Sequence, residues 1–404
     1  MLMRMQAVFV LVVLITQAAF SCTSAVISGR ATRDGRPILW KQRDTGVLEN
    51  KLVHDTGGRY RYIGVHDQAD VHNEECFMGS NEAGFSIINT ASYNLRYKTY
   101  EGKMDEEGKV MREALSTCRT LADFERLLTR TAGARGVEAN FGVIDASGGA
   151  AYYETDPYAF VKYDVNDPAV APQGYLLRTN FSMSGPVDKG QGYIRYQAAS
   201  DLFAWARLGD GLSVEMILLD GTCDLKHALV GTDLTREPLP VDEEARSIVY
   251  FADFIPRFTS VGSMIIQGVR QGEDAAATTM WTVLGSPLTT PVMPLWVAHA
   301  DRIPAMMFSH SSMAAALNAR SLALKERLFP MKTAEGRNYL DLARVVNRAG
   351  TGTVQRLRPV DREIMRRTAA VPLTSTGLRA AGDVESLYRS IGQLIQEYYL
   401  SYGL

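Results

Sequence analysis

The sequence predicts an α+β fold built on antiparallel sheets. Strand-like and helix-like segments are mixed along the chain, several strand pairs are joined by short turns as hairpins, and the steady β-α-β alternation of a parallel sheet is missing. The chain has 404 residues, of which 46% are hydrophobic and 22% charged. This composition is that of an ordinary globular protein, and a chain of this length can bury a core without disulfides.

The first 21 residues differ from the rest of the chain. A short positively charged start precedes an uncharged apolar run over residues 7–16, and Ala19 and Ser21 place small residues at −3 and −1 before Cys22. This layout is that of a secretory signal peptide, and the apolar run is shorter than the roughly 20 residues of a spanning helix. We therefore expect a signal peptide over residues 1–21, no stable membrane span, and an exported (periplasmic or extracellular) mature chain.

Cleavage before Cys22 gives one residue both a thiol and a free α-amino group. An α-amine has a pKa of about 7.7–8 and a thiol one of about 8.5, so the amine can accept the thiol proton and later return it to a leaving group. Nucleophile and base then come from a single residue. Two alternatives stay open: Cys22 is a lipoprotein cysteine, whose lipidated sulfur only anchors the protein, or cleavage falls elsewhere.

The residues after Cys22 predict a hairpin. A β-prone stretch is followed by the turn signal Asp34-Gly35 and then by an apolar return strand. A turn at this dipeptide brings Arg43 and Asp44 back beside the start of the mature chain. The hairpin therefore delivers a carboxylate and a guanidinium that can orient the N-terminal amine.

The remaining segments follow strand-like or helix-like patterns. We expect strands around 77–79, 84–88, 141–144, 150–153, 174–178 and 247–254, and helical stretches over 108–130, 194–208 and 384–399. The strand at 84–88 runs out into a polar stretch that begins at Asn89. Asp145 is interpreted as a turn former and is left out of the site.

Charge and motif content argue against several functional classes. Lys and Arg number 43 against 45 Asp and Glu, so there is no basic field that would attract nucleic acid. The six histidines form no short metal-ligand motif, and no P-loop, dinucleotide fingerprint or Gly-x-Ser-x-Gly elbow is present. We expect no cofactor, no metal and no nucleic-acid partner. The pairing of Cys76, Cys118 and Cys223 in disulfides stays open.

The predicted mature start, CTSAVISGRATRDGRPILWKQRDTG (22–46), resembles the N-terminal-nucleophile hydrolases of the choloylglycine hydrolase and penicillin V acylase group. It looks closest to the branch with isopenicillin-N acyltransferase, and it is also similar to the related N-terminal-cysteine dipeptidases. The likeness extends to GSNEAGFSIINTASYN (79–94), ANFGVIDASGGAAYYE (139–154), LLRTNF (176–181), the region of Arg195 and MWTVLGSPLTTPVMPLW (280–296). It covers about the first 300 residues. We expect a single catalytic domain over 22–404, with an unmatched helical part at 330–404.

The resemblance implies a four-layer αββα sandwich of two antiparallel sheets, with the N-terminal cysteine at the end of a central strand. It also implies site residues. Cys22 looks like the nucleophile and its amine like the base, and Asp44 resembles the aspartate that holds this amine. Asn89 resembles the asparagine that helps bind the oxyanion. Asn180 is similar to a second asparagine near the nucleophile, and Arg195 to a late arginine of the site.

The chain departs from the family's pattern beside Asp44. The family often has arginine three residues before the aspartate, whereas this chain reads Lys41-Gln42-Arg43-Asp44. Either Lys41 replaces the arginine or Arg43 reaches in from the adjacent position. Because neighbouring strand residues point to opposite faces, Arg43 and Asp44 both face Cys22 only if the strand pairing contains a bulge.

The resulting hypothesis is an exported hydrolase that cleaves a linear carbon–nitrogen amide bond of a small molecule through an acyl-thioester on Cys22. Hydrolysis is favoured over acyl transfer because an exported enzyme has no ready supply of acyl-CoA. The alternatives are a dipeptidase of the related type and a non-catalytic surface lipoprotein. The acyl group stays open among bile-salt conjugates, penicillin V, N-acyl amino acids and peptides, as does a homo-oligomer, which is common in the group.

Overall fold

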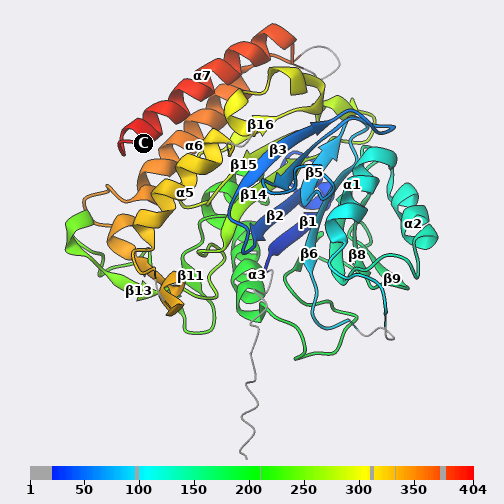
Figure 1. The fold of residues 1–404 in the computed structure, drawn as a ribbon, viewed down its shortest axis with the longest axis horizontal. Coiled ribbons are helices and arrows are strands. Elements are labelled where there is room, and N and C mark those ends of the chain that lie inside the picture. Colours follow the sequence, from blue (N-terminus) through cyan, green and yellow to red (C-terminus); the bar gives the residue numbers. More distant parts are fainter. Residues whose placement is uncertain (1–20, 96–99, 210, 310–313, 333, 374–378) are drawn as a thin grey trace, which may run out of the picture.

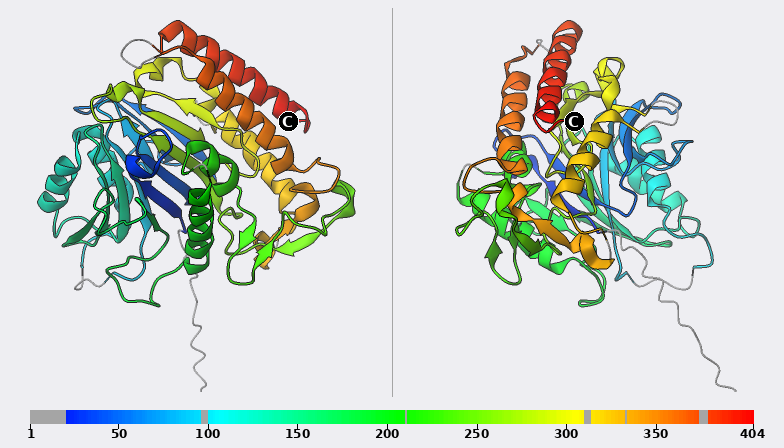
Figure 2. Two further views of the ribbon diagram at one scale, coloured as in Figure 1. Left: turned by 180° about the vertical axis from the view of Figure 1, so that it is seen from behind. Right: turned by 60° about the vertical axis from the view of Figure 1, so that its left-hand side comes forward.

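A computed structural model describes the chain over residues 21–95, 100–209, 211–309, 314–332, 334–373 and 379–404. Figures 1 and 2 show it from three sides. Apart from Ser21, the predicted signal peptide lies outside the described residues and stays a prediction. Within the described ranges, no helix combines the length and the apolar character needed to cross a bilayer.

Two large antiparallel sheets form the centre of the molecule. The six-stranded sheet has the order β10-β1-β2-β14-β15-β16 and the seven-stranded sheet the order β3-β4-β5-β6-β7-β8-β9. The strands of the first are β1 (Thr23–Ile27), β2 (Ile38–Asp44), β10 (Tyr175–Arg178), β14 (Ser260–Gln267), β15 (Thr279–Val283) and β16 (Met293–Leu295). Those of the second are β3 (Asn50–Asp55), β4 (Tyr62–Asp67), β5 (Met78–Asn81), β6 (Ser86–Ala91), β7 (Ala139–Ile144), β8 (Ala150–Thr155) and β9 (Phe160–Asp164). The predicted α+β class is confirmed.

Helices cover the outer face of each sheet, which completes the predicted αββα layering. The helices are α1 (Glu107–Thr117), α2 (Leu121–Arg130), α3 (Tyr193–Leu208), α4 (Val214–Met216), α5 (Ala316–Leu328), α6 (Thr353–Ala370) and α7 (Ala381–Leu400). Helix α1 packs on β5 and β6 of the seven-stranded sheet, and α3 packs on β1 and β10 of the six-stranded sheet. Figure 1 shows α1 and α2 on one side of the sheets and α5 to α7 on the other.

Shorter elements connect these layers. Two small antiparallel pairs are formed by β11 (Lys226–His227) with β12 (Thr232–Asp233) and by β13 (Ile248–Tyr250) with β17 (Tyr339–Asp341). Single helical turns lie at Gly29–Ala31, Ile217–Gly221, Glu243–Ala245, Ala275–Ala277, Val297–Arg302, Ala305–Met307, Ala334–Asn338 and Leu342–Arg344. The C-terminal part is mainly helical, as expected, but it also supplies β17.

The inner faces of the two sheets meet closely. Val26 of β1 and Ile88 of β6 are fully buried in one apolar core. A Cβ atom placed on Gly142 of β7 would lie 2.8 Å from Val26 Cγ2 and 3.0 Å from Ile88 Cγ1. Because glycine has no side chain, Gly142 permits the two sheets to approach closely at this position. This close approach brings β1 and β6 together.

Two segments differ from the predicted pattern. The helical spacing over 108–130 belongs to two helices, α1 and α2. The second begins after its N-cap residue Thr120, which forms a capping box with Asp123. The expected strand over 247–254 is reduced to β13. Phe251 and Phe254 leave the strand and stack on each other at 4.3 Å in a separate core.

Candidate active site

The predicted hairpin places Cys22 at the entrance of β1. Strands β1 and β2 pair antiparallel with Thr23 opposite Gln42, so Cys22 lies level with Arg43. The turn contains Gly35 at φ +78°, a conformation that a glycine adopts without strain. Cys22 is 5% exposed, and its Sγ lies 3.9 Å from the Asp44 backbone carbonyl oxygen. The sequence-based expectation that the hairpin returns to Cys22 is confirmed.

A register shift interrupts the pairing of β2 beside Arg43 and Asp44. Strand β2 pairs with β14, and Asp44 lies opposite Ser260 while Arg43 lies opposite Gly262. The extra residue therefore sits on β14, not on β2. Irregularities of this kind re-aim side chains at functional sites.

Cys22 lines a cavity of about 220 Å³. The cavity wall includes two cations, five carboxylates and one amide. These groups belong to Lys41, Arg43, Asp44, Asp67, Glu75, Asp105, Glu107 and Asn89, and the remaining wall is formed by Thr45, Phe77 and Ala91. Cys22, Asp44, Asn89 and Arg43, four of the six residues proposed from sequence, therefore share one cavity.

Asp44 is buried and neutralised by an arginine that the sequence analysis missed. The Arg257 guanidinium forms an ion pair with the Asp44 carboxylate, and Ser260 Oγ donates a second hydrogen bond to it at 2.5 Å. The same Arg257 nitrogen donates to the Ser21 carbonyl oxygen at 2.8 Å. The ion pair thus stands directly at the Ser21–Cys22 peptide bond.

Asn89 is held by Lys41. The Lys41 ammonium donates to Asn89 Oδ1 at 2.5 Å and to the Phe77 carbonyl at 2.8 Å. Because lysine can only donate, the oxygen of the Asn89 amide must face it, which leaves the NH₂ group for other partners. Burial lowers the pKa of Lys41 to about 8; the nearby Cys22 opposes this shift and Arg43 adds to it. Asn89 lies inside β6, opposite Phe141, and not beyond the strand end as expected.

Arg43 takes a different direction from Lys41. Its guanidinium forms an ion pair with Asp67 at 2.7 Å, donates to Asn50 Oδ1, and lies 4.1 Å from the centre of the Phe77 ring. Of the two cations between which the sequence analysis could not choose, Lys41 contacts the candidate oxyanion residue. Arg43 instead forms part of the cavity wall, where it is paired with Asp67.

Arg195 and Asn180 approach Cys22 from the backbone side. Arg195 donates to the Cys22 carbonyl oxygen at 2.5 Å, to Thr23 Oγ1 at 3.0 Å and to Asn180 Oδ1 at 2.8 Å. Asn180 Nδ2 in turn donates to the Ala91 carbonyl at the end of β6. Burial lowers the pKa of Arg195 to about 9, with a further contribution from Arg257. Both residues therefore hold the backbone around the thiol and do not line the cavity.

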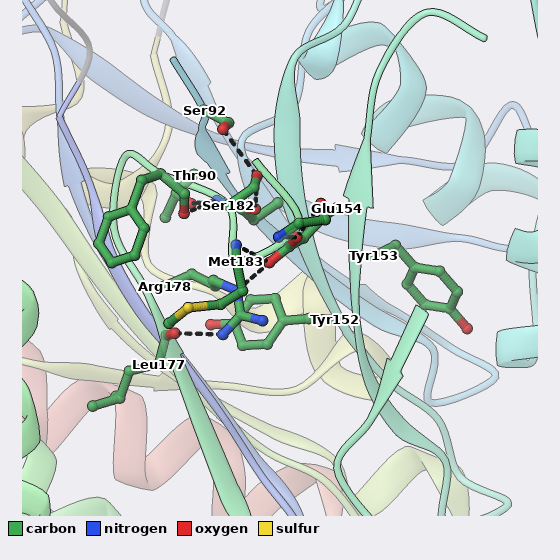
Figure 3. Close-up of polar contacts among 12 residues, drawn as sticks. Thr90, Ser92, Tyr152, Tyr153, Glu154, Leu177, Arg178, Ser182 and Met183 are labelled. Atoms are coloured by element: carbon green, nitrogen blue, oxygen red, sulfur yellow. Dashed lines mark hydrogen bonds and ion pairs between the residues drawn. The ribbon is translucent and has the colours of Figure 1, made fainter. Parts of the chain in front are cut away.

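A buried polar network fixes the segment that carries Asn180 (Figure 3). The Glu154 carboxylate accepts hydrogen bonds from Arg178 Nε at 2.8 Å and from the backbone N–H groups of Met183 and Ser184 at 2.7 Å. Ser182 Oγ donates to Asn140 Oδ1 at 2.6 Å. Asn180 is thus tied down on both sides, before and after it in the chain.

The other cysteines lie outside this site. Cys76, Cys118 and Cys223 are free and buried, so no disulfide joins them. Burial raises their pKa values to about 12, 11 and 12 respectively. A thiol with a raised pKa is a poor nucleophile, and none of these three residues lines the cavity beside Cys22.

The charged and hydroxyl residues of the cavity and its ion pairs that sequence reasoning missed are Asp67, Glu75, Asp105, Glu107, Arg257 and Ser260. Each reaches the site through tertiary packing, and no short motif marks it. Within the described part of the chain, no group of three His, Cys, Asp or Glu side chains is arranged to hold a metal ion. The arrangement that remains is a thiol, an oriented amide and a buried ion pair around one small cavity.

No protein-family model and no curated protein sequence matches the chain. Several solved structures are similar to it at low identity. A Caenorhabditis elegans N-acylethanolamine-hydrolyzing acid amidase ortholog is 17% identical, with a TM-score of 0.40, over 61% of this chain and 92% of that chain. A variant of conjugated bile acid hydrolase from Clostridium perfringens is 10% identical, with a TM-score of 0.40, over 69% and 93%. Penicillin V acylase from Agrobacterium tumefaciens is 13% identical, with a TM-score of 0.36, over 69% and 87%.

Proposed function

We propose that this chain is a hydrolase of linear amide bonds whose nucleophile is the Cys22 thiol, after removal of the residues before it. One observation carries this proposal. Arg257, which is paired with Asp44, donates a hydrogen bond to the Ser21 carbonyl oxygen, so the ion pair lies beside the peptide bond whose cleavage would create the α-amine of Cys22. In this proposal the Asp44 carboxylate holds the new ammonium after cleavage, and the thiol of the same residue, which lines the cavity, is the nucleophile.

The first half of the reaction forms a thioester. The sulfur attacks the carbonyl carbon of the substrate amide while the thiol proton passes to the α-amine of Cys22. The Asn89 NH₂ group donates to the resulting oxyanion, because its oxygen is already engaged by Lys41. Collapse of the intermediate breaks the C–N bond, and the α-ammonium gives its proton to the leaving nitrogen.

The second half releases the acid. The α-amine, neutral again, takes a proton from a water molecule as that water attacks the thioester carbonyl. The tetrahedral intermediate then expels the sulfur, which recovers its proton from the ammonium, and the carboxylic acid leaves. Asn89 stabilises the oxyanion in both halves, an interaction worth roughly 2.7–4 kcal/mol in comparable sites.

Export through a signal peptide over residues 1–21 belongs to the same proposal, because signal peptidase would create the N-terminal cysteine without any self-cleavage. A lipidated Cys22 would block the thiol and leave a surface-anchored binding protein instead. The proposed substrate is a small amide, and in the chain that still carries Ser21 the cavity beside Cys22 measures about 220 Å³.

Trapping of the acyl-enzyme tests this proposal. Mature protein is mixed with small acyl 4-nitroanilides, quenched in acid and digested, and the peptides are weighed. The proposal predicts an acyl adduct on the peptide that begins with Cys22, its loss in Cys22→Ala, and its retention in the matched control Cys118→Ala. Turnover that survives in Cys22→Ala would rule the proposal out.

A further inference from the structure

Helix α5 carries three buried polar side chains on one face. Asn318, Ser321 and Lys325 are three and four residues apart, a spacing that places them on the same side of a helix. Each of the three residues is at most 1% exposed. A lysine is almost never buried to this extent unless its ammonium group has a specific partner. The contacts of Lys325 therefore need an explanation.

Two of these side chains reach the surroundings of Cys22. Asn318 Oδ1 accepts a hydrogen bond from the backbone N–H of Asn50 at 3.3 Å, and Asn50 in turn binds Arg43 of the cavity wall. The Lys325 ammonium group donates to the Phe258 carbonyl oxygen at 2.7 Å. Helix α5 therefore supports the site at two separate points.

The second of these points is a turn that delivers both partners of Asp44. Ser260 Oγ accepts a hydrogen bond from the Arg257 N–H at 2.9 Å and donates to the Asp44 carboxylate at 2.5 Å, while the Arg257 guanidinium pairs with the same carboxylate. The Ser260 N–H donates to the Arg257 carbonyl at 3.0 Å and closes the turn. Phe258 lies inside this turn, so the bond from Lys325 to its carbonyl ties the turn to α5.

The Phe258 ring is held as firmly as its backbone. Lys325 Nζ lies 4.7 Å from the ring centre and the Arg337 guanidinium 4.9 Å from it. The Phe329 ring packs edge-on against it at 5.3 Å. Lys325 thus contacts both the backbone and the ring of one residue, which leaves the turn little freedom to move.

The ammonium group of Lys325 is an expensive way to fill this space. Burial lowers the pKa of Lys325 to about 7, and Asp44 opposes this shift while Arg337 adds to it. Because the unfolded chain binds this proton more tightly than the folded chain, the charge destabilises the fold. An apolar side chain of similar length would avoid that cost but could not hold the Phe258 carbonyl.

We propose that Lys325 is a positioning residue of the Cys22 site, which holds the Phe258 carbonyl and thereby keeps Arg257 and Ser260 on Asp44. The inference rests on the proposed function, in which Asp44 holds the α-ammonium of Cys22. Lys325 touches no substrate and acts only through the turn. Without it, the amine that serves as base loses its orientation.

The pH dependence of Cys22 alkylation reads this role without turnover. Mature protein reacts with iodoacetamide at a series of pH values, and the midpoint of the rate profile reports the coupled thiol and amine of Cys22. An ammonium held by Asp44 favours the thiolate, so Lys325→Met should move the midpoint up by at least about 0.5 pH unit. Lys325→Arg, which keeps a charged donor, should restore much of the shift. The matched control Lys332→Met should not change the profile, because Lys332 pairs with Glu326 at the surface.

Turnover of the acyl 4-nitroanilides gives a second readout. Misplacing a catalytic group from a distance lowers kcat with little effect on binding, so Lys325→Met should lose at least about tenfold in kcat while KM changes less than about twofold. Lys325→Arg should recover part of this loss. Unchanged kcat and an unchanged alkylation profile in Lys325→Met would overturn the positioning role and leave the hydrolase standing. A shifted profile in a protein that hydrolyses none of the amides would instead count against the hydrolase.

Urea unfolding separates positioning from a merely structural role. The folded-state pKa of Lys325 is about 7 against an ordinary 10.5, so the charge destabilises the fold fully below pH 7 and progressively less as pH rises above 7. Lys325→Met should therefore unfold at a urea concentration no lower than the wild type at pH 6, with a smaller advantage at pH 9. Loss of activity in a variant that is no less stable supports positioning. An activity loss that follows a lower urea midpoint at both pH values would overturn it.

Discussion

The side-chain oxygen of Asn89 accepts a hydrogen bond from the Lys41 ammonium at 2.5 Å, and this contact decides which end of the amide is available to a substrate. Lysine can only donate hydrogen bonds, so Lys41 cannot accept one from the Asn89 NH₂ group, and the amide oxygen must face Lys41. Lys41 therefore orients the candidate oxyanion donor.

Replacing Asn89 by alanine should remove an oxyanion donor and leave the thiol in place. We expect kcat to fall by roughly 100- to 1,000-fold, while alkylation of Cys22 by iodoacetamide keeps its rate. Steady-state kinetics and timed mass spectra measure the two quantities. Asn166→Ala serves as the control, because Asn166 bonds Ser28 and Gly148 away from the cavity. Unchanged turnover in Asn89→Ala would remove Asn89 from the mechanism.

Lys41→Met should free the Asn89 amide to rotate. The lost hydrogen bond is charge-assisted and worth about 1.5–3 kcal/mol, so kcat should fall by about 10- to 100-fold. Lys41→Arg keeps a donor toward Asn89 Oδ1 and should recover part of the activity. A methionine variant as active as the wild type would show that Asn89 needs no such anchor.

Arg257→Gln should leave the Asp44 carboxylate buried without its charge partner. Breaking a buried pair in this way costs about 3–5 kcal/mol of stability. The double variant Asp44→Asn/Arg257→Gln should lose less than the sum of the two single variants, since it leaves no unpaired charge. Urea unfolding of the four proteins gives the coupling energy. Strictly additive losses would mean that the pair contributes nothing.

Glu107→Gln should stabilise the protein at high pH. Because the folded-state pKa is about 7 and the ordinary value is 4.5, the folded state binds this proton more tightly. Its contribution to stability is therefore complete below pH ~4.5 and is lost as pH rises through 7. Glutamine does not titrate, so the variant should gain up to about 3 kcal/mol over the wild type at pH 8 and little at pH 4.5. Urea unfolding at both pH values measures this, and a difference that does not depend on pH would contradict it.

The parts of the site that lie close in sequence were predictable. Cys22 and Asp44 are joined by one hairpin with a recognisable turn, and hydrogen bonding between adjacent strands leaves little freedom in where the return strand ends. Asn89 was identified at the end of an apolar run next to the same core, although the strand extends past it. In each case a local pattern determines the position to within a residue or two.

The partners that complete the site come from far along the chain. Arg257 pairs with Asp44 across 213 residues, and its approach depends on β14 inserting beside β2. Glu107 begins a helix that covers the other sheet and reaches the cavity only through the packing of that sheet. Periodicity and turn signals carry no information about such contacts, because they depend on which strands become neighbours.

The central claim is that the mature chain begins at Cys22 with both its thiol and its amine free. Intact mass and N-terminal sequencing of the exported protein test this most directly. The account predicts a chain that starts at Cys22, carries no added mass and takes up one equivalent of alkylating reagent at that residue. A diacylglycerol mass on Cys22, or a start several residues away, would remove both the nucleophile and its base and contradict the account.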